Sequence, residues 1–108
     1  MSVVSLQELG DLLEKTNLPV AYNHFKTAQN LPFIAYIDTG TDNFIADNKV
    51  YHRVIRVNVE LYTHVKDSKT EQLLEDLLNN NEVPYNYTGT YFIESEDMYQ
   101  TIYQITLI

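Results

Sequence analysis

Two stretches of the chain repeat leucine at the spacing of an amphipathic helix. The first opens with Ser5-Leu6-Gln7-Glu8, a serine and a glutamate placed as in a capping box, and predicts a helix over residues 6–16. Ser68-Lys69-Thr70-Glu71 repeats this pattern and opens a second predicted helix, which ends in Asn79-Asn80-Asn81. Each helix would present one leucine-rich side to a sheet.

The clearest alternation of apolar and polar residues runs from Val50 to His64 and predicts a strand with one buried side. One face carries Tyr51, Ile55, Val57, Val59 and Leu61, and the other carries His52, Arg56, Asn58, Glu60, Tyr62 and His64. Shorter extended segments are predicted over residues 19–22, 31–37, 84–87, 91–93 and 97–107. Turn-forming residues predict a loop over 38–49 and a turn over 88–90.

We predict the order of elements as α-β-β-β-α-β-β, counting two strands after the second helix. We predict an α+β fold in two layers, with a largely antiparallel sheet and two helices on one face. A length of 108 residues corresponds to one domain, residues 1–108. The strand over 50–64 would be about 50 Å long, whereas a compact chain of this size has a radius of gyration of about 13 Å. We therefore expect part of the strand and the preceding loop to project as a hairpin arm.

An apolar triplet, Phe44-Ile45-Ala46, falls at the predicted tip of this arm. Such a triplet either folds back onto its own domain or docks onto a partner, and docking is our working hypothesis. The distribution of charge also indicates an interface. Residues 49–69 carry five bases and two acids (net +3), whereas the rest of the chain carries two bases and thirteen acids (net −11). Two surfaces of opposite charge would attract each other between copies. The candidate interface residues are Phe44, Ile45, Lys49, Arg53, Arg56 and Lys66.

Composition excludes several classes of protein. The net charge of −8 disfavours nucleic-acid binding through phosphates. The chain has no cysteine, which excludes disulfide scaffolds, thiolate zinc sites and cysteine nucleophiles. No apolar run is long enough for a membrane span and no secretory signal is visible, so we expect no membrane partner and a cytosolic location, or a particle assembled there.

Few motifs suggest chemistry. The three glycines are too scattered for a phosphate-binding loop, and no Gly-x-Ser-x-Gly motif occurs. The stretch from Asp38 to Asp42 resembles a calcium loop, but its glycine is misplaced and Lys49 stands where the bidentate glutamate belongs. We therefore expect no metal and no cofactor.

The polar face of the long strand carries the best candidate catalytic set. His52, Arg56, Glu60 and His64 include the residue types that cleave phosphodiesters, with a base, an acid and a charge stabiliser. The two histidines, however, are about 40 Å apart along an extended strand. We therefore expect no enzyme, although a nuclease or hydrolase built on this set remains an alternative.

Several phrases of the sequence resemble small head–tail morphogenesis proteins of long-tailed bacteriophages and prophages of Gram-positive bacteria. They are LPVAYNHF (18–25), PFIAY (32–36), DNF with ADN (42–48), VNVELYT (57–63) and YQTIY (99–103). The resemblance implies a tail-completion or tail-terminator-like role. It implies a ring, often a hexamer, that assembles in the host cytoplasm, sits at the head–tail junction of the virion and contacts tail-tube and head-completion proteins.

A different class of function fits the same composition. A small regulatory or inhibitory binding module would use the acidic surface and the nine tyrosines to dock a host protein. The sequence leaves this alternative open.

Overall fold

The computed structural model describes residues 5–46 and 49–107, and within them the side chains of 5–41 and 54–107. Helix α1 (Leu6–Leu13) is capped by Ser5, whose hydroxyl oxygen accepts from the Glu8 backbone N–H at 3.1 Å. A short 3₁₀ turn, η1 (Glu14–Thr16), continues it and ends at Asn17 in the left-handed region. The predicted first helix and its cap are confirmed.

Five strands form one sheet in the order β1-β2-β3-β5-β4. Their bounds are β1 (Val20–Tyr22), β2 (Phe33–Ala46), β3 (Lys49–Thr63), β4 (Tyr85–Ile93) and β5 (Met98–Leu107). The pair β1–β2 is parallel, and the other three pairs are antiparallel. The predicted α+β class, element order and largely antiparallel sheet are therefore confirmed.

The second helix, α2 (Ser68–Asn80), begins one residue earlier than its predicted cap implies, because Asp67 caps it in place of Ser68. The Asp67 carboxylate accepts from the Thr70 backbone N–H at 3.1 Å and from the Thr70 hydroxyl at 2.7 Å. Glu71 does not complete a capping box, since its carboxylate binds Lys66 at 2.7 Å. The predicted box is wrong because aspartate offers two acceptor oxygens at the position just before the serine.

The predicted loop over 38–49 and the predicted turn over 88–90 are also wrong. Residues 33–46 and 85–93 each form one strand, and the sheet register shifts at Gly40 and at Gly89. Thr39 and Thr88 are the residues left out of the pairing, and the glycine that follows each has positive φ, 131° and 127°, which glycine adopts readily. Glycine flanked by turn formers here marks a β-bulge, which bends a strand without ending it.

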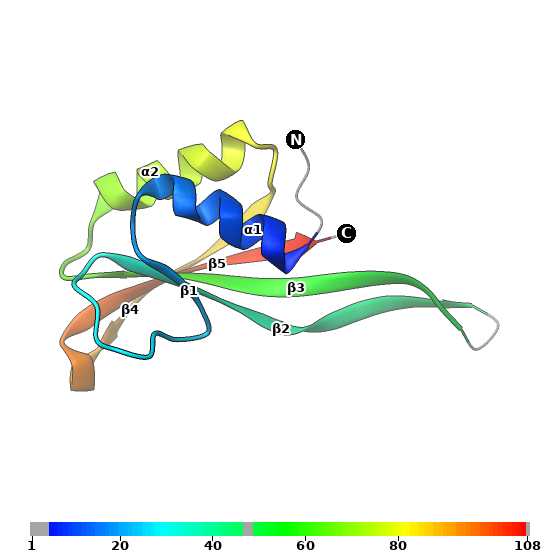
Figure 1. The fold of residues 1–108 in the computed structure, drawn as a ribbon, viewed down its shortest axis with the longest axis horizontal. Helices are drawn as coiled ribbons and strands as arrows, with labels where there is room; N and C mark the ends of the chain where they lie inside the picture. Colours follow the sequence, from blue (N-terminus) through cyan, green and yellow to red (C-terminus); the bar gives the residue numbers. More distant parts are fainter. Residues whose placement is uncertain (1–4, 47–48, 108) are drawn as a thin grey trace.

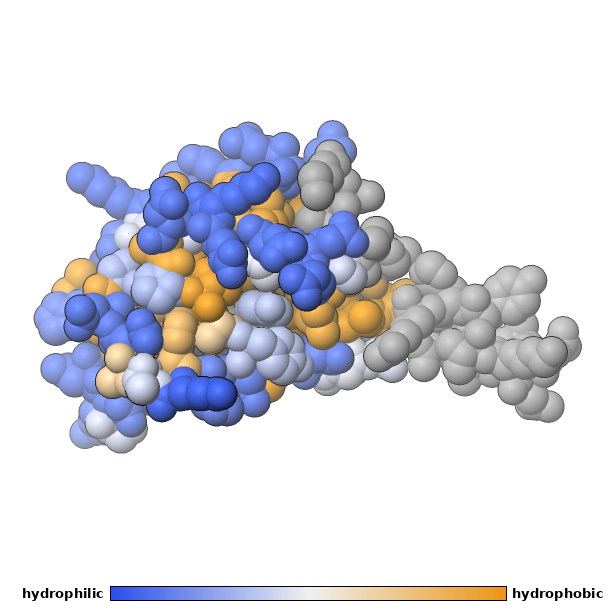
Figure 2. All heavy atoms as spheres, viewed as in Figure 1, coloured by the Kyte–Doolittle hydropathy of each residue, from blue (hydrophilic) through white to orange (hydrophobic). Residues whose placement is uncertain are grey.

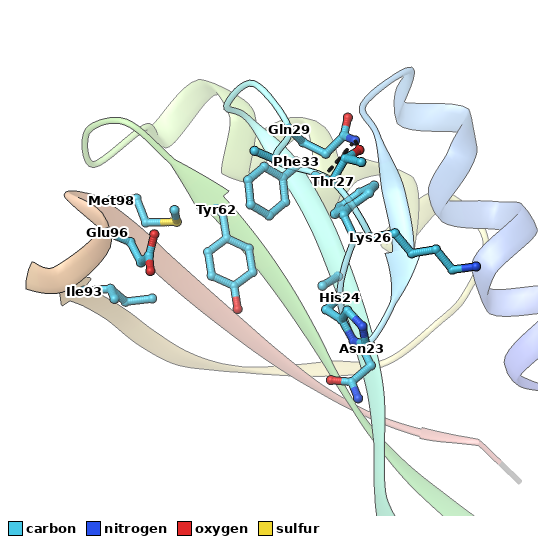
Figure 3. A pocket seen from close by; sticks show the side chains of 13 residues that line it. Asn23, His24, Lys26, Thr27, Gln29, Phe33, Tyr62, Ile93, Glu96 and Met98 are labelled. Atoms are coloured by element: carbon cyan, nitrogen blue, oxygen red, sulfur yellow. Dashed lines mark hydrogen bonds between the residues drawn. The ribbon is translucent and has the colours of Figure 1, made fainter.

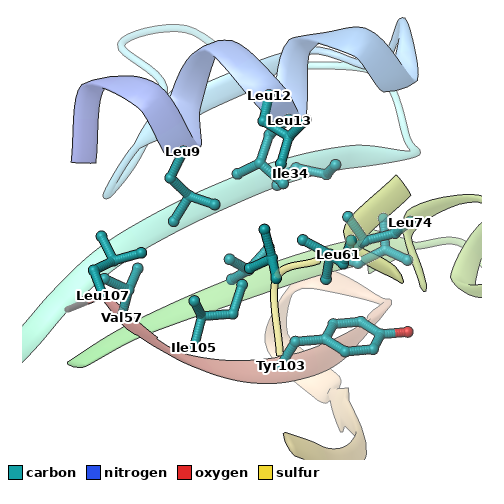
Figure 4. Close-up of a cluster of buried hydrophobic side chains, with 13 residues drawn as sticks. Leu9, Leu12, Leu13, Ile34, Val57, Leu61, Leu74, Tyr103, Ile105 and Leu107 are labelled. Carbon is teal, nitrogen blue, oxygen red and sulfur yellow. The ribbon is translucent and has the colours of Figure 1, made fainter. Parts of the chain in front are cut away.

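Both helices cover the same face of the sheet (Figure 1). Between the layers lies a core of leucine, isoleucine and valine with one buried tyrosine (Figure 4). Val57, Val59 and Leu61 of β3 are fully buried in it, as the alternation in the sequence predicts. Hydrophilic side chains coat the outer side of the helix layer (Figure 2). Within the described part of the chain, neither helix is long and apolar enough to cross a membrane.

The hairpin of β2 and β3 extends well past the other strands (Figure 1). The strand β5 accompanies β3 only from Ile55 onward, and β1 accompanies β2 only at 34–36. We call residues 42–46 and 49–54 the arm and the remaining described residues the body. The molecule measures 49 × 30 × 25 Å, and the arm lies at one end of its long axis (Figure 1). The predicted projecting arm is thus present, built from two paired strands.

Candidate assembly surfaces

The arm is a two-stranded ribbon. Five cross-strand pairs hold it together, from Asp42↔Val54 to Ala46↔Lys49. Among the residues that the structure describes, neither outer edge of this ribbon is paired with another strand. Unpaired strand edges are natural sites for contact with another chain.

Four of the six candidate interface residues lie in the arm: Phe44, Ile45, Lys49 and Arg53. Their backbone belongs to β2 and β3, with Phe44 opposite His52, while their side chains lie outside the described residues. The structure therefore brings these four positions together on one projecting ribbon.

The other two candidates lie apart from this group. Arg56 is exposed on β3 in the body, opposite Gly40 of β2 and Thr106 of β5, close to the base of the arm. Lys66 lies beyond the opposite end of β3, half-exposed, where its ammonium donates to Glu71 at 2.7 Å, Tyr87 at 2.8 Å and Thr90 at 3.2 Å. The hydrogen bond to Glu71 is the main cause of its raised pKa. Part of the charge difference between residues 49–69 and the rest of the chain is thus neutralised within one copy.

The sheet face opposite the helices carries a hollow of about 520 Å³ near the end remote from the arm (Figure 3). The loop 23–32, which joins β1 to β2, folds beneath this face and forms one wall of the hollow. The other wall is the turn η2 (Glu94–Glu96) with its neighbours Ile93 and Met98. Phe33 and Tyr62 lie between the two walls.

A row of aromatic rings forms the floor of the hollow. Phe33 stacks on Tyr62, with ring centroids 4.9 Å apart and an interplanar angle of 23°, because the two residues face each other in the β2–β3 register. Phe25 from the loop meets Phe33 edge-on at 5.3 Å. Such pairs add about 0.5–1.5 kcal/mol beyond their buried area. The row fixes the loop against the sheet and leaves an apolar concave surface.

Hydrogen bonds hold Tyr62 in place. Its hydroxyl donates to Glu60 Oε1 at 3.0 Å and accepts from Gln100 Nε2 at 2.8 Å. Burial, and secondarily the charge of Glu60, raise the pKa of Tyr62 to about 12. The phenol therefore stays protonated well above neutral pH, so Tyr62 itself adds no charge to the floor.

The two walls of the hollow differ in charge. Lys26 lies on the loop wall together with His24, whereas Glu96 lies on the opposite wall (Figure 3). Residues 94–97 include Glu94, Glu96 and Asp97 and no base, so this wall is acidic. The hollow is not predicted by any motif of the sequence. Phe25, a large aromatic residue inside a polar stretch, was the signal that the loop packs onto something.

The candidate catalytic set does not converge. The strand β3 runs unbroken from Lys49 to Thr63, so His52 lies near its start and His64 follows its other end. The Glu60 carboxylate accepts from Tyr62, and His64 is exposed. Within the described residues, no group of three or more His, Asp and Glu side chains is placed to hold a metal ion. No protein-family model matches this chain, and no curated protein matches its sequence.

Proposed function

We propose that this protein is a non-catalytic assembly protein of a long-tailed bacteriophage or prophage, of the tail-completion or tail-terminator kind. In this role, copies form a ring at the head–tail junction, with six copies as the working hypothesis. Tail-tube and head-completion proteins are its proposed neighbours, and assembly takes place in the host cytoplasm. The observation that carries the proposal is the arm, a two-stranded ribbon that extends beyond the body and whose outer edges pair with no other strand in the part of the chain that the structure describes.

An arm of this kind contributes little to the stability of its own copy. Among the described side chains, the core lies between the helices and the body of the sheet, and an isolated two-stranded hairpin is marginally stable in water. A projecting ribbon is therefore better explained by contact with another molecule. This supports an assembly role over a regulatory module, which would need only a surface patch.

Ring formation also requires two different surfaces on each subunit, because a cyclic assembly repeats one heterologous contact until it closes. The arm lies at one end of the long axis and the hollow lies toward the other. Two unlike surfaces at opposite ends of a molecule meet this requirement.

The proposal is tested by measuring self-association. We expect purified protein to form a discrete oligomer in sedimentation velocity and light scattering, and annular particles in negative-stain electron microscopy. In a matched variant, Asn-Gly replaces residues 44–52, which closes the hairpin at the Asn43↔Arg53 pair. This variant should keep the circular dichroism spectrum and the cooperative unfolding of the parent, and should be monomeric.

Two results would contradict the proposal. One is a parent protein that stays monomeric at every concentration, alone and with tail-tube protein added. The other is an oligomer that survives the shortened hairpin unchanged, because assembly would then not depend on the arm.

A further inference from the structure

We infer that the hollow on the open face of the sheet receives the arm of a second copy of this chain. The inference rests on the proposed function and names the surface that the arm contacts. The contact is head-to-tail: each copy inserts its arm into one neighbour and receives the arm of another.

The placement of the two surfaces favours this contact. The hollow lies toward one end of the 49 Å axis, and the arm forms the other end. A copy therefore cannot insert its own arm into its own hollow, because the paired strands run away from it. A second copy can present its arm there, and the same contact then repeats from copy to copy.

The chemistry of the hollow matches the end of the arm. Its floor is apolar and aromatic, and Tyr62 is fixed by two hydrogen bonds. The sequence of the arm ends β2 with the apolar triplet Phe44-Ile45-Ala46. Aromatic anchors in a preorganised concave site are the usual centre of binding energy, since little freedom is lost on docking.

Charge sets the orientation of the docked arm. In the arm, β3 contributes Lys49 and Arg53 and no acid, while β2 contributes Asp42 and no base. In the hollow, the η2 wall is acidic and the loop wall carries Lys26. The complementary orientation places β3 of the arm along η2, and β2 of the arm along the loop. The reverse orientation would set like charges against each other on both sides.

This orientation is testable by cross-linking because the chain has no cysteine of its own. One cysteine replaces Ala46, at the end of β2 in the arm, and another replaces Ala28, an exposed residue that lines the loop wall. The double variant A28C/A46C should form intermolecular disulfides under mild oxidation. The expected product is a covalent ladder whose largest member equals the number of copies in the ring.

Two controls accompany the double variant. The variant E82C/A46C carries its second cysteine at an exposed residue between α2 and β4, away from the hollow, and should form at least about tenfold less cross-linked product. Each single variant should yield no product longer than a dimer. Equal ladders from both double variants would overturn the inference, since the contact would then be non-specific.

Charge reversal gives an independent test. The variants Glu96→Lys and Arg53→Glu should each weaken self-association by about tenfold, whereas Glu82→Lys, which changes the net charge as much as Glu96→Lys does, should not. The double variant E96K/R53E should recover most of the loss. Failure of this rescue would contradict the inferred orientation.

Different results would overturn the assembly role and the hollow as the acceptor of the arm. An oligomer that needs the arm but tolerates Glu96→Lys, and gives no A28C/A46C ladder, would keep the assembly role and overturn the hollow as the acceptor. A parent that never associates would overturn both.

Discussion

Tyr103 of β5 donates a hydrogen bond from its hydroxyl to Glu75 Oε2 of α2 at 2.8 Å. The Tyr103 side chain is fully buried in the core, and its ring meets those of Tyr85 and Tyr87 edge-on. The hydroxyl therefore reaches through the apolar layer to a carboxylate on the helix. This contact ties α2 to the sheet at a defined position, which apolar packing alone would not specify.

We expect Tyr103→Phe to lower the free energy of unfolding by about 0.5–1.5 kcal/mol, the usual net value of one hydrogen bond. Burial, followed by the hydrogen bond to Glu75, raises the pKa of Tyr103 above its ordinary 10.0. A raised pKa means that the contribution is complete below pH 10 and is lost as the pH rises further. Urea unfolding should therefore show a steeper alkaline loss of stability in the parent than in the variant.

Tyr91→Phe is the matched control for Tyr103→Phe. The Tyr91 hydroxyl donates to the Thr88 carbonyl at 2.9 Å on the exposed strand β4. Its removal should change the free energy of unfolding by less than about 0.5 kcal/mol. Equal losses of unfolding free energy from the two variants would show that the buried hydrogen bond to Glu75 stabilises the fold no more than the exposed one does.

Asp67→Ala should destabilise the protein by about 0.5–2 kcal/mol at neutral pH, because α2 loses its N-cap. Hydrogen bonds from the Thr70 side chain and, secondarily, its backbone lower the pKa of Asp67 below 3.8. The stabilisation is therefore complete above pH 3.8 and is lost as the pH falls through the lowered value. Asp67→Asn should keep the cap but lose this acid dependence. Identical acid unfolding of the parent and Asp67→Asn would contradict the assignment.

Gly89→Ala should destabilise the protein by about 1–3 kcal/mol, since φ at this bulge is 127° and an L side chain is strained there. The added Cβ would also lie 3.3 Å from the Tyr91 hydroxyl. Thermal and urea unfolding measure the change, with Asn86→Ala, an exposed substitution in the same strand, as the control. If both variants unfold alike, the bulge does not depend on glycine.

Phe44→Asp should leave the melting temperature unchanged and weaken self-association, because it introduces a charge into a contact expected to exclude water. Calorimetry and light scattering on the same sample separate the two effects. A lower melting temperature with unchanged association would indicate instead that Phe44 packs within its own copy.

Simultaneous replacement of His52, Glu60 and His64 by alanine should leave assembly intact. The strand keeps the two histidines at opposite ends, so they cannot act on one substrate. Assays of self-association and of DNA cleavage, run on the parent and the triple variant, test this. Nuclease activity that the parent has and the variant lacks would favour the catalytic alternative.

Local patterns predict the elements of this fold, and the two errors within the strands share one cause. The leucine spacing of α1 and the alternation along β3 predict both elements to within a few residues. The residues around Gly40 and Gly89 predict a loop and a turn because a bulge and a turn use the same residue types. Only the pairing with β3 and β5, which is a long-range property, decides between the two.

The hollow was not predictable for a related reason. Its floor combines Phe25, Phe33 and Tyr62, which come from a loop and two strands. Each of them has an ordinary local explanation, and only the β2–β3 register brings Phe33 opposite Tyr62. The arm was predictable because its length follows from one strand alone.

The strand β3 belongs to both the arm and the core, and this has a mechanical consequence. Its first residues form the arm, and Val57, Val59 and Leu61 of the same strand are clamped under the helices. A pull on the arm is therefore transmitted along a continuous backbone into the middle of the sheet, where β2 and β5 resist it by shear. Tension between neighbouring copies would therefore act on the paired strands of the sheet and not on the loops.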